Sequence, residues 1–390
     1  MKKSLKTKLK QLNFVIVSHI FATGPALDLE EYLKDKVKSL FFIGHPFSFR
    51  KEINSFYRFY KDGKLKEEHK AFGWRFPEVL FYFKDSFYTF WWIFKQKENF
   101  NYYIGSDNFS AFLGLILKKL GKVDQVILYT IDYLPQRFKN PVLNKLYHFF
   151  DKTCLKNCKI VWNVSPVMAK AREEFDGLKI EECVPQILVS LGMWHKRIPK
   201  LPLEKKDRYK IVFMGHILDK QGLDIVVKAM PLILKKIPQV KLLIIGTGPD
   251  EERLKSIAKK LEVEKRIEFT GYVEDHKDVE KMLAHSTVAV ATYKPDPGSF
   301  TNWADPSKLK NYLSAGLPIF LTSVPPVAKE LERANCAIIV PYKENQLAEK
   351  IIYLLNNEVM LKQYIKNAVN FAKQYDWNLV FTNALSSSLD

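Results

Sequence analysis

The stretch Asp305–Pro318, which reads DPSKLKNYLSAGLP, decides the fold of this chain. Its pattern predicts a helix over residues 307–314 and an apolar strand at residues 318–322. The N-terminus of such a helix carries unpaired N–H groups and a partial positive charge, both of which favour an anion. The first turn adds the Ser307 hydroxyl and the Lys308 cation. The stretch therefore predicts a nucleoside-diphosphate site in an α/β domain, with an ordinary capped helix of a parallel sheet as the alternative.

Size and composition suit two domains and an anionic partner. A chain of 390 residues is too long for one ordinary domain, and its 47% hydrophobic content can fill two cores. The formal net charge of +18 predicts attraction to nucleic acid, to a membrane leaflet or to phosphorylated substrates. No uncharged run approaches the ~20 residues that cross a bilayer, and the apolar run at residues 14–17 is too short for a signal peptide. We therefore expect a cytoplasmic protein that does not span a membrane.

The four cysteines predict neither disulfides nor a metal site. Cys154 and Cys158 lie one helical turn apart, and no second pair with metal-site spacing accompanies them. Together with Cys183 and Cys336 they are interpreted as reduced thiols of a cytosolic protein.

Strands and helices alternate along the C-terminal half. Strands are predicted at residues 211–215, 241–246, 267–271, 287–291, 318–322 and 337–340, and helices at 223–235, 251–261, 278–285, 307–314, 324–334 and from about 347 onward. Such alternation predicts a parallel, doubly wound sheet, whose ligands bind outside the carboxyl ends of the strands. Those ends carry glycine-containing turns after the first three strands and the loop at residues 293–306.

The N-terminal half shows the same rhythm less regularly, with strands predicted at residues 13–18, 39–44, 102–105, 125–130 and 160–163. A stretch rich in proline and basic residues follows at 197–203. We therefore predict an N-terminal domain over residues 1–197 and a C-terminal domain over residues 204–375. A weak helix break at 375–378 predicts that the tail, residues 376–390, crosses back to the first domain.

The C-terminal half resembles the nucleotide-sugar-binding domain of GT-B glycosyltransferases, most of all glycosyltransferase family 4. Four pieces match in order and spacing over roughly 110 residues: 212–215, 244–249, 269–273 and 308–318. The N-terminal half resembles the family more loosely, at 24–25, 107–108, 132–133 and 163–165. The resemblance implies two Rossmann-like, doubly wound α/β domains that face each other across a cleft. It also implies transfer of a sugar from a nucleotide-diphosphate donor, with retention and without a metal, and no Asp-x-Asp occurs in the chain.

The chain departs from the family pattern at the donor site. An Arg and a Lys that follow the first glycine in the family are replaced here by His216 and Gln221, with Lys220 beside the latter. The paired glutamates of the family fall on Trp303 and Asn311. We therefore expect a subfamily with altered donor contacts, in which Asn311 bonds a ribose hydroxyl.

Three residues are predicted to take part in the chemistry. Asp132 is expected to orient an acceptor hydroxyl or to act as a base, Lys220 to neutralise the leaving phosphate, and His216 to donate to a phosphate oxygen. A turn aspartate, a solvated lysine and a loop histidine are the respective alternatives. Asp107, Ser18 and His19 lie at other strand ends toward the same cleft.

The donor is predicted to contact a larger set of residues around Lys308, the expected diphosphate ligand. Tyr272 and Val273 would line the base pocket, and Asp305 would replace the missing carboxylate that orients the sugar. The predicted donor-binding residues are Gly215, Gly246, Gly248, Tyr272, Val273, Asp305, Ser307, Lys308 and Asn311. No metal ligands and no cofactor are predicted.

Residues 72–94 are dense in aromatic side chains. One helical stripe cannot bury them all, because they occupy nearly every face. Aromatic residues beside Arg75, Lys84 and Lys95 are typical of a surface at a membrane interface. The basic residues of the segment 50–70 would add attraction to anionic lipid, of order 1 kcal/mol each. A thick core helix and a dimer interface are the alternatives.

These features predict a retaining glycosyltransferase at the inner face of the membrane. Its acceptor is expected to be a lipid-linked saccharide, a glycolipid or a cell-surface polysaccharide. A GT-B-type nucleotide-sugar epimerase is an alternative, against which the loss of the paired glutamates argues. A basic nucleic-acid-binding protein is another, although no helix-turn-helix, zinc or RNP-type signature occurs.

Overall fold

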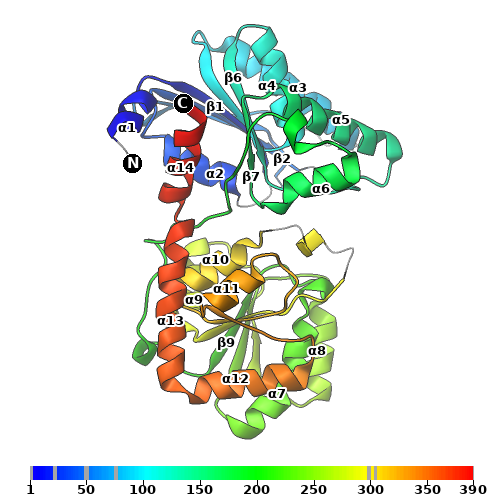
Figure 1. The fold of residues 1–390 in the computed structure, drawn as a ribbon, viewed down its shortest axis with the longest axis vertical. Helices are drawn as coiled ribbons and strands as arrows, with labels where there is room; N and C mark the ends of the chain where they lie inside the picture. Colours follow the sequence, from blue (N-terminus) through cyan, green and yellow to red (C-terminus); the bar gives the residue numbers. More distant parts are fainter. Residues whose placement is uncertain are drawn as a thin grey trace. The chain divides into compact units, whose positions relative to one another are not determined.

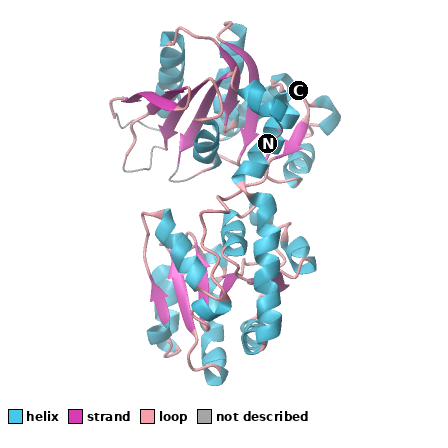
Figure 2. Cartoon of the chain, turned by 90° about the vertical axis from the view of Figure 1, so that its left-hand side faces the viewer, coloured by secondary structure: helices cyan, strands magenta, loops and turns pink. Residues whose placement is uncertain are grey.

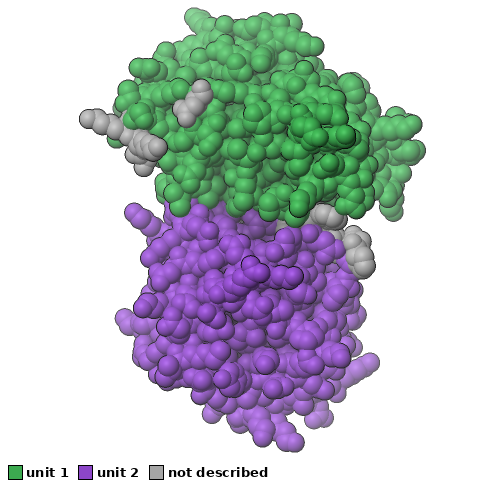
Figure 3. Space-filling model, in the orientation of Figure 1, with its two compact units in different colours: residues 1–190, 377–390 green, residues 191–376 purple. Residues whose placement is uncertain are grey.

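The computed structural model describes residues 3–20, 24–47, 52–73, 78–296, 300–302 and 305–389 (Figure 1). The chain forms two compact units, residues 1–190 with 377–390 and residues 191–376 (Figure 3). The division falls a few residues before the boundary that the sequence predicted, because Leu191 and Met193 form hydrogen bonds with residues of unit 2. The N–H of Leu191 donates to Asp305, and that of Met193 to the carbonyl of Tyr375.

Unit 1 is built on an eight-stranded sheet in the order β4-β3-β2-β1-β5-β6-β7-β8, with helices beside it (Figures 1 and 2). All neighbours from β2 to β8 pair in parallel. The strands are β1 (Asn13–Ile20), β2 (Ser39–Pro46), β3 (Phe56–Lys61), β4 (Lys64–Lys70), β5 (Phe100–Gly105), β6 (Val123–Thr130), β7 (Ile160–Asn163) and β8 (Gln186–Leu188). The α-helices are α1 (Lys3–Leu9), α2 (Pro25–Leu33), α3 (Glu78–Lys95), α4 (Asn108–Lys119), α5 (Pro141–Asn157), α6 (Val167–Asp176) and α14 (Trp377–Leu389).

The β3–β4 hairpin is an antiparallel addition to this parallel sheet that the sequence analysis missed. Every residue of β4 is exposed, so its sequence KLKEEHK lacks the apolar alternation that marks a half-buried strand. Charged side chains protect such an edge strand from pairing with another chain. The turn between the strands, Asp62-Gly63, has φ values of 51° and 78°. An Asp-Gly pair is a known hairpin signal, so the hairpin was predictable from the turn rather than from the strand.

Unit 2 is a six-stranded parallel sheet in the order β11-β10-β9-β12-β13-β14. Its strands are β9 (Lys210–Met214), β10 (Lys241–Ile245), β11 (Ile267–Phe269), β12 (Val288–Ala291), β13 (Ile319–Leu321) and β14 (Ala337–Ile339). Its α-helices are α7 (Leu223–Lys236), α8 (Glu251–Lys260), α9 (His276–His285), α10 (Ser307–Ser314), α11 (Ala328–Arg333), α12 (Glu344–Asn356) and α13 (Glu358–Ala372). One apolar cluster joins the sheet to α7, α8 and α12, and a second joins it to α9, α10, α11 and α13. The prediction of two doubly wound, Rossmann-like α/β sheets is confirmed.

Helix α11 begins later than the sequence predicted. It starts at Ala328 rather than at residue 324, because Pro325 and Pro326 lack the N–H donors that a helix needs and restrict the residues before them. The last helical region is interrupted at Asp376, and α14 then packs within unit 1. There the hydroxyls of Tyr32 and Thr382 lie 2.7 Å apart.

Candidate functional site

The candidate donor site lies in unit 2, at the carboxyl ends of β9 and β12. The strand order reverses between these two neighbours, and open α/β sheets bind ligands at such a switch point. Gly215 follows β9 directly, and Lys308 stands in the first turn of α10, beyond β12. The two residues meet, since a Cβ added to Gly215 would lie 3.0 Å from Nζ of Lys308.

The amine of Lys308 has no carboxylate partner among the described residues. Its Nζ donates to Oε1 of Gln221 at 2.7 Å and lies 4.2 Å from the ring centroid of Phe213 and 5.5 Å from that of Tyr293. Burial lowers the pKa of Lys308 to about 7. A phosphate beside this amine would supply the missing negative charge and a strong, charge-assisted hydrogen bond. Gln221 stands where the family resemblance leads us to expect a lysine, and here it holds Lys308 in place.

Gly246 and Gly248 are explained by the packing of two loops. A Cβ added to Gly246, whose φ is 127°, would lie 2.2 Å from the carbonyl oxygen of Gly215. One added to Gly248 would lie 2.1 Å from the carbonyl oxygen of Ile217. The loop after β10 therefore approaches the loop after β9 closely only because both positions lack a side chain.

Five other predicted residues lie on the surface at this end of the sheet or beside it. His216, Lys220 and Ser307 are exposed, and Val273 is half-buried. Tyr272 is 66% exposed. Their side chains are accessible to a ligand, and their roles stay predictions.

Asp305 and Asn311 are engaged within unit 2. Asp305 forms a buried ion pair with Lys310, and one of its oxygens accepts from the N–H of Leu191 at 3.2 Å. Asn311 is buried, and its Nδ2 donates to the carbonyl of Ser307 at 3.3 Å. The structure thus gives Asp305 a structural partner that the sequence did not reveal. Trp303, on which one of the missing glutamates falls, lies outside the described residues.

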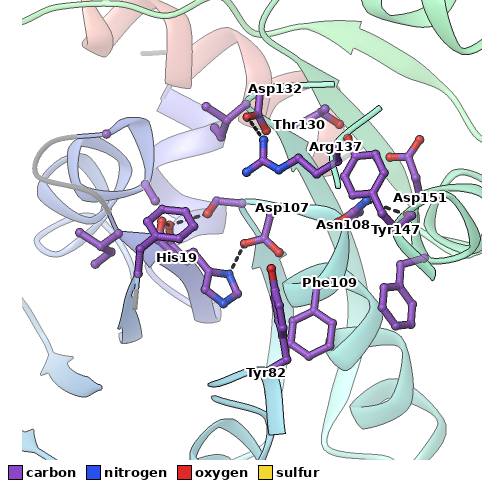
Figure 4. Close-up of a pocket in the computed structure, with 18 of the residues that line it drawn as sticks. His19, Tyr82, Asp107, Asn108, Phe109, Thr130, Asp132, Arg137, Tyr147 and Asp151 are labelled. Carbon is purple, nitrogen blue, oxygen red and sulfur yellow. Dashed lines mark hydrogen bonds and ion pairs between the residues drawn. The ribbon is translucent and has the colours of Figure 1, made fainter. Parts of the chain in front are cut away.

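A pocket of about 440 Å³ lies in unit 1 at the carboxyl ends of β1, β5 and β6 (Figure 4). The strand order reverses here too, between β1 and β5. Aromatic rings of Phe47, Tyr82, Phe109, Phe138, Tyr147 and Phe150 form much of its wall, and its polar lining includes Ser18, His19, Ser106, Asp107, Asn108, Asp132, Arg137 and Asp151.

His19 is held between two carboxylates at one end of this pocket. Its Nδ1 lies 2.9 Å from Oδ2 of Asp107 (Figure 4), and its Nε2 lies 3.3 Å from Oδ2 of Asp85 on α3. Burial alone would lower the pKa of His19, but the two carboxylates outweigh it and raise the pKa to about 10. Against the opposing effect of burial, the His19 charge helps to lower the pKa of Asp107 to about 2. His19 is therefore a fixed cation, with both nitrogens engaged, and not a free base.

Asp132, a predicted catalytic residue, lines the opposite part of the pocket and forms an ion pair with Arg137 (Figure 4). Its side chain is 42% exposed, whereas that of Asp107 is 27% and that of Asp151 is 2% exposed. Helix α5 fixes the loop that carries this pair, since Oδ1 of Asn144 accepts from the N–H of Arg137 at 2.8 Å. Asp132 is thus the most accessible of these three pocket carboxylates.

Several pocket residues were missed by the sequence analysis. The analysis did not identify Arg137, Tyr147 or the contact between His19 and Asp85, because the elements that meet at the pocket are far apart in the sequence. The available signals were the polar residues at the carboxyl ends of β1 and β5, of which His19 and Asp107 were named.

Helix α3 divides the aromatic segment into a buried and an exposed face. Phe81, Trp92 and Ile93 are buried, and the ring of Trp92 lies 5.1 Å from that of Tyr57 on β3. The opposite face exposes a stripe of large apolar side chains, Leu80, Phe83, Phe87, Trp91 and Phe94, which are between 45% and 69% exposed. Five residues named in the sequence analysis of this region lie outside the described residues: Arg50, Lys51, Trp74, Arg75 and Phe76.

Among the described residues, no helix combines the length and the apolar composition of a membrane-spanning segment. No group of three or more His, Cys, Asp or Glu side chains in the same residues is placed to hold a metal ion.

The comparisons with known proteins agree with this geometry. Residues 196–371 match the family of glycosyl transferases group 1. The chain is 26% identical, over 172 residues, to a phosphatidyl-myo-inositol mannosyltransferase of Mycobacterium leprae, a match that covers 44% of this chain and 43% of that protein. The chain therefore spans less than half the length of this curated relative.

Solved structures match the whole fold at low identity. HepE of Anabaena in complex with UDP has a TM-score of 0.64 and 13% identity, and the match covers 97% of this chain and 100% of that one. WaaG, a glycosyltransferase involved in lipopolysaccharide biosynthesis, has a TM-score of 0.63 and 14% identity over 95% of this chain and 98% of that one.

The fold is that of GT-B glycosyltransferases. Unit 2 carries the glycosyl transferases group 1 domain. The resemblance stated from the sequence is confirmed, and a family 4 membership is consistent with it.

Proposed function

We propose that the chain transfers a sugar from a nucleotide-diphosphate sugar, bound in unit 2, to an acceptor bound in the pocket of unit 1. The observation that carries this proposal is the amine of Lys308, enclosed beside Gly215 at the switch point without a carboxylate partner among the described residues. The family match over residues 196–371 supports it, as does the fold shared with a UDP complex.

The chemistry follows from the charge that develops on the departing diphosphate. Lys308 and the first N–H groups of α10 would stabilise this charge, with His216 and Lys220 as further donors at the surface. Asp132, the accessible carboxylate of the pocket, would accept a hydrogen bond from the acceptor hydroxyl and orient it. We infer retention of the anomeric configuration from the family resemblance.

We further propose that the acceptor lies at a membrane and that α3 rests on the lipid. The exposed stripe of α3 places Phe87 and Trp91 on one face, and α5 exposes Val142, Leu146 and Phe149. Amphipathic helices with such a face lie in the headgroup region, and the net charge of +18 favours an anionic leaflet. The mannosyltransferase relative is named for a phosphatidylinositol lipid, and WaaG is involved in lipopolysaccharide biosynthesis, which supports an acceptor with a lipid part.

A thermal-shift screen tests the donor half of the proposal. UDP, GDP, CMP and their common sugar conjugates are added without metal to the wild-type chain and to Lys308→Ala. We expect a saturable rise in Tm for one nucleotide that is absent in the variant. No shift with any nucleotide would overturn the proposal.

Flotation with liposomes tests the membrane half. We expect the wild type to float with vesicles containing anionic lipid, and the double variant Phe87→Ser/Trp91→Ser to stay in solution. Leu379→Ser, an exposed apolar position on α14 (44% exposed), is the matched control and should float like the wild type. Equal flotation of the double variant would contradict a lipid contact through α3.

A further inference from the structure

We infer that the pocket of unit 1 accepts an uncharged group, and that the acceptor is therefore a neutral glycoside whose sugar is joined to its apolar part without a phosphate inside the pocket. This inference rests on the proposed function, because it names the acceptor of the same reaction. Three features of the pocket carry it: its charges, its walls and its rim.

The charges at the pocket cancel in pairs. The cation of His19 faces Asp107 and Asp85, and the second oxygen of Asp85 lies 3.2 Å from Nζ of Lys84. Arg137 pairs with Asp132. The remaining charged lining residue, Asp151, is bonded by the buried Arg172, whose Nε lies 2.8 Å from its Oδ2. Four carboxylates thus meet four cations around the cavity.

This balance disfavours an anionic ligand. A phosphate or carboxylate that entered would lose its water and find no unpaired cation among the described residues that line the pocket. Burial of a charge without a partner is strongly unfavourable. The whole chain has 61 Lys and Arg residues, of which the described lining of the pocket includes Arg137 and no lysine. In unit 2, by comparison, the amine of Lys308 lacks a carboxylate partner among the described residues. Unit 2 therefore suits a phosphate, and the pocket of unit 1 suits an uncharged group.

The walls suit a sugar with an apolar attachment. The rings of Tyr82 and Phe109 lie 5.0 Å apart in an edge arrangement, and both face the cavity (Figure 4). Such rings pack against the C–H faces of a ring or against methylene groups, while Asp132 and Asn108 offer polar atoms to hydroxyls. The volume of about 440 Å³ lies within the range of small-molecule sites.

The rim connects the cavity to the exposed apolar surface. Phe83 of α3 and Leu146 of α5 line the pocket, and they are 69% and 44% exposed. An alkyl chain attached to the bound sugar would therefore leave the pocket across apolar side chains. A diphosphate link at this position would instead meet Phe83 and Leu146, neither of which compensates a charge.

Direct binding measurements test the inference without a donor. Octyl glucoside, octyl galactoside and octyl mannoside, each below its micelle concentration, are titrated into the full chain, and octyl phosphate and hexose 1-phosphates serve as anionic counterparts. We expect saturable binding of at least one glycoside and at least tenfold weaker binding of every phosphate. A phosphate that binds as tightly as the best glycoside, or no glycoside binding, would overturn the inference.

Two variants locate the site and test the charge argument. Phe109→Ala should weaken glycoside binding at least tenfold, whereas Phe94→Ser, on the exposed stripe but outside the lining, should leave it unchanged. Asp132→Asn frees Arg137 from its partner and should strengthen octyl phosphate binding at least tenfold. Insensitivity to Phe109→Ala, or no gain in Asp132→Asn, would contradict a charge-balanced pocket.

The outcome is distinguishable from a failure of the proposed function. If no nucleotide binds to unit 2 while glycosides bind as predicted, the transferase proposal fails and the pocket assignment stands. If a nucleotide binds through Lys308 while the pocket prefers phosphates, the transferase proposal stands and the neutral acceptor is wrong.

Discussion

Replacing Lys308 by methionine should stabilise the protein at low pH while removing its donor site. The pKa of Lys308 is about 7 in the folded chain and 10.5 in the unfolded chain. That difference corresponds to a cost of about 5 kcal/mol for holding the charged amine in place. The cost is fully present below pH 7 and disappears as the pH rises to 10.5, because the unfolded chain binds the proton over that interval and the folded chain does not.

The expected gain is smaller than this limit. Methionine fills a similar volume, and its side chain remains an apolar neighbour of the Phe213 and Tyr293 rings. The substitution loses the hydrogen bond to Gln221, which is worth about 1 kcal/mol. We therefore expect Lys308→Met to raise the free energy of unfolding of unit 2 by up to about 4 kcal/mol at pH 6 and to change it little at pH 10.

Urea unfolding at both pH values, followed by circular dichroism, measures this difference. Lys310→Met is the comparison on the same helix, because burial also lowers the pKa of Lys310 to about 7 but its amine is paired with Asp305, which the substitution would leave without that partner. Removal of one partner of a buried pair should destabilise the chain by about 3–5 kcal/mol at neutral pH. A Lys308→Met variant that is destabilised at pH 6, or whose change in stability does not depend on pH, would refute the low pKa of an amine enclosed without a carboxylate partner.

Three further predictions concern protonation and loop packing. Binding of the preferred nucleotide at pH 8.5 should take up about one proton, because a phosphate restores the charge of Lys308. Titration calorimetry in two buffers of different ionisation enthalpy measures this uptake, which should vanish in Lys308→Met. His19→Asn should destabilise unit 1 more at pH 6 than at pH 10. The raised pKa of His19 contributes stability that is fully present below pH 6.5 and is lost as the pH rises through about 10. A loss of stability in the variant that grows with pH would contradict this prediction. Gly248→Ala should lower Tm and nucleotide affinity, because the added Cβ would lie 2.1 Å from a carbonyl oxygen. Gly24→Ala, whose added Cβ would have no heavy atom within 4 Å, should leave both quantities unchanged. Equal effects of the two substitutions would refute the loop-packing argument.

The sheet architecture could be predicted from the sequence because its signals are local. Apolar runs such as residues 211–215 end in glycine, and helices follow at regular spacing, so a parallel, doubly wound sheet in unit 2 could be predicted from the sequence alone. The β3–β4 hairpin escaped because β4 is a fully exposed edge strand whose charged residues resemble a loop. Its Asp-Gly turn was the one usable signal.

Candidate site residues could be proposed from the sequence where a single residue stands at a helix start or after a strand. Lys308 was identified from its place in the first turn of α10, and Asp132 from its place after β6. The pairing of Asp305 with Lys310 was not visible, because a carboxylate near a helix start has the same local pattern whether it binds a ligand or an internal lysine. The His19 cluster joins β1, α3 and the start of α4, and no local pattern connects such distant residues.

Aromatic density in the segment 72–94 illustrates a similar limit. Composition marks an unusual helix, but only the packing of Trp92 against Tyr57 separates the buried face from the exposed one. The exposed stripe from Leu80 to Phe94 is what the membrane proposal now rests on.

Sugar transfer is tested most directly by a transfer assay with the donor that the thermal-shift screen selects. The wild-type chain, its Lys308→Ala variant and an octyl glycoside acceptor are incubated with that donor, and the product is followed by mass spectrometry and by the anomeric proton signals in NMR. We predict a product one sugar larger that keeps the anomeric configuration of the donor, formed by the wild type and not by the variant. A chain that binds the nucleotide and forms no glycosylated product with any of the neutral or phosphorylated acceptors would contradict the account, and a product of inverted configuration would contradict the inferred retention.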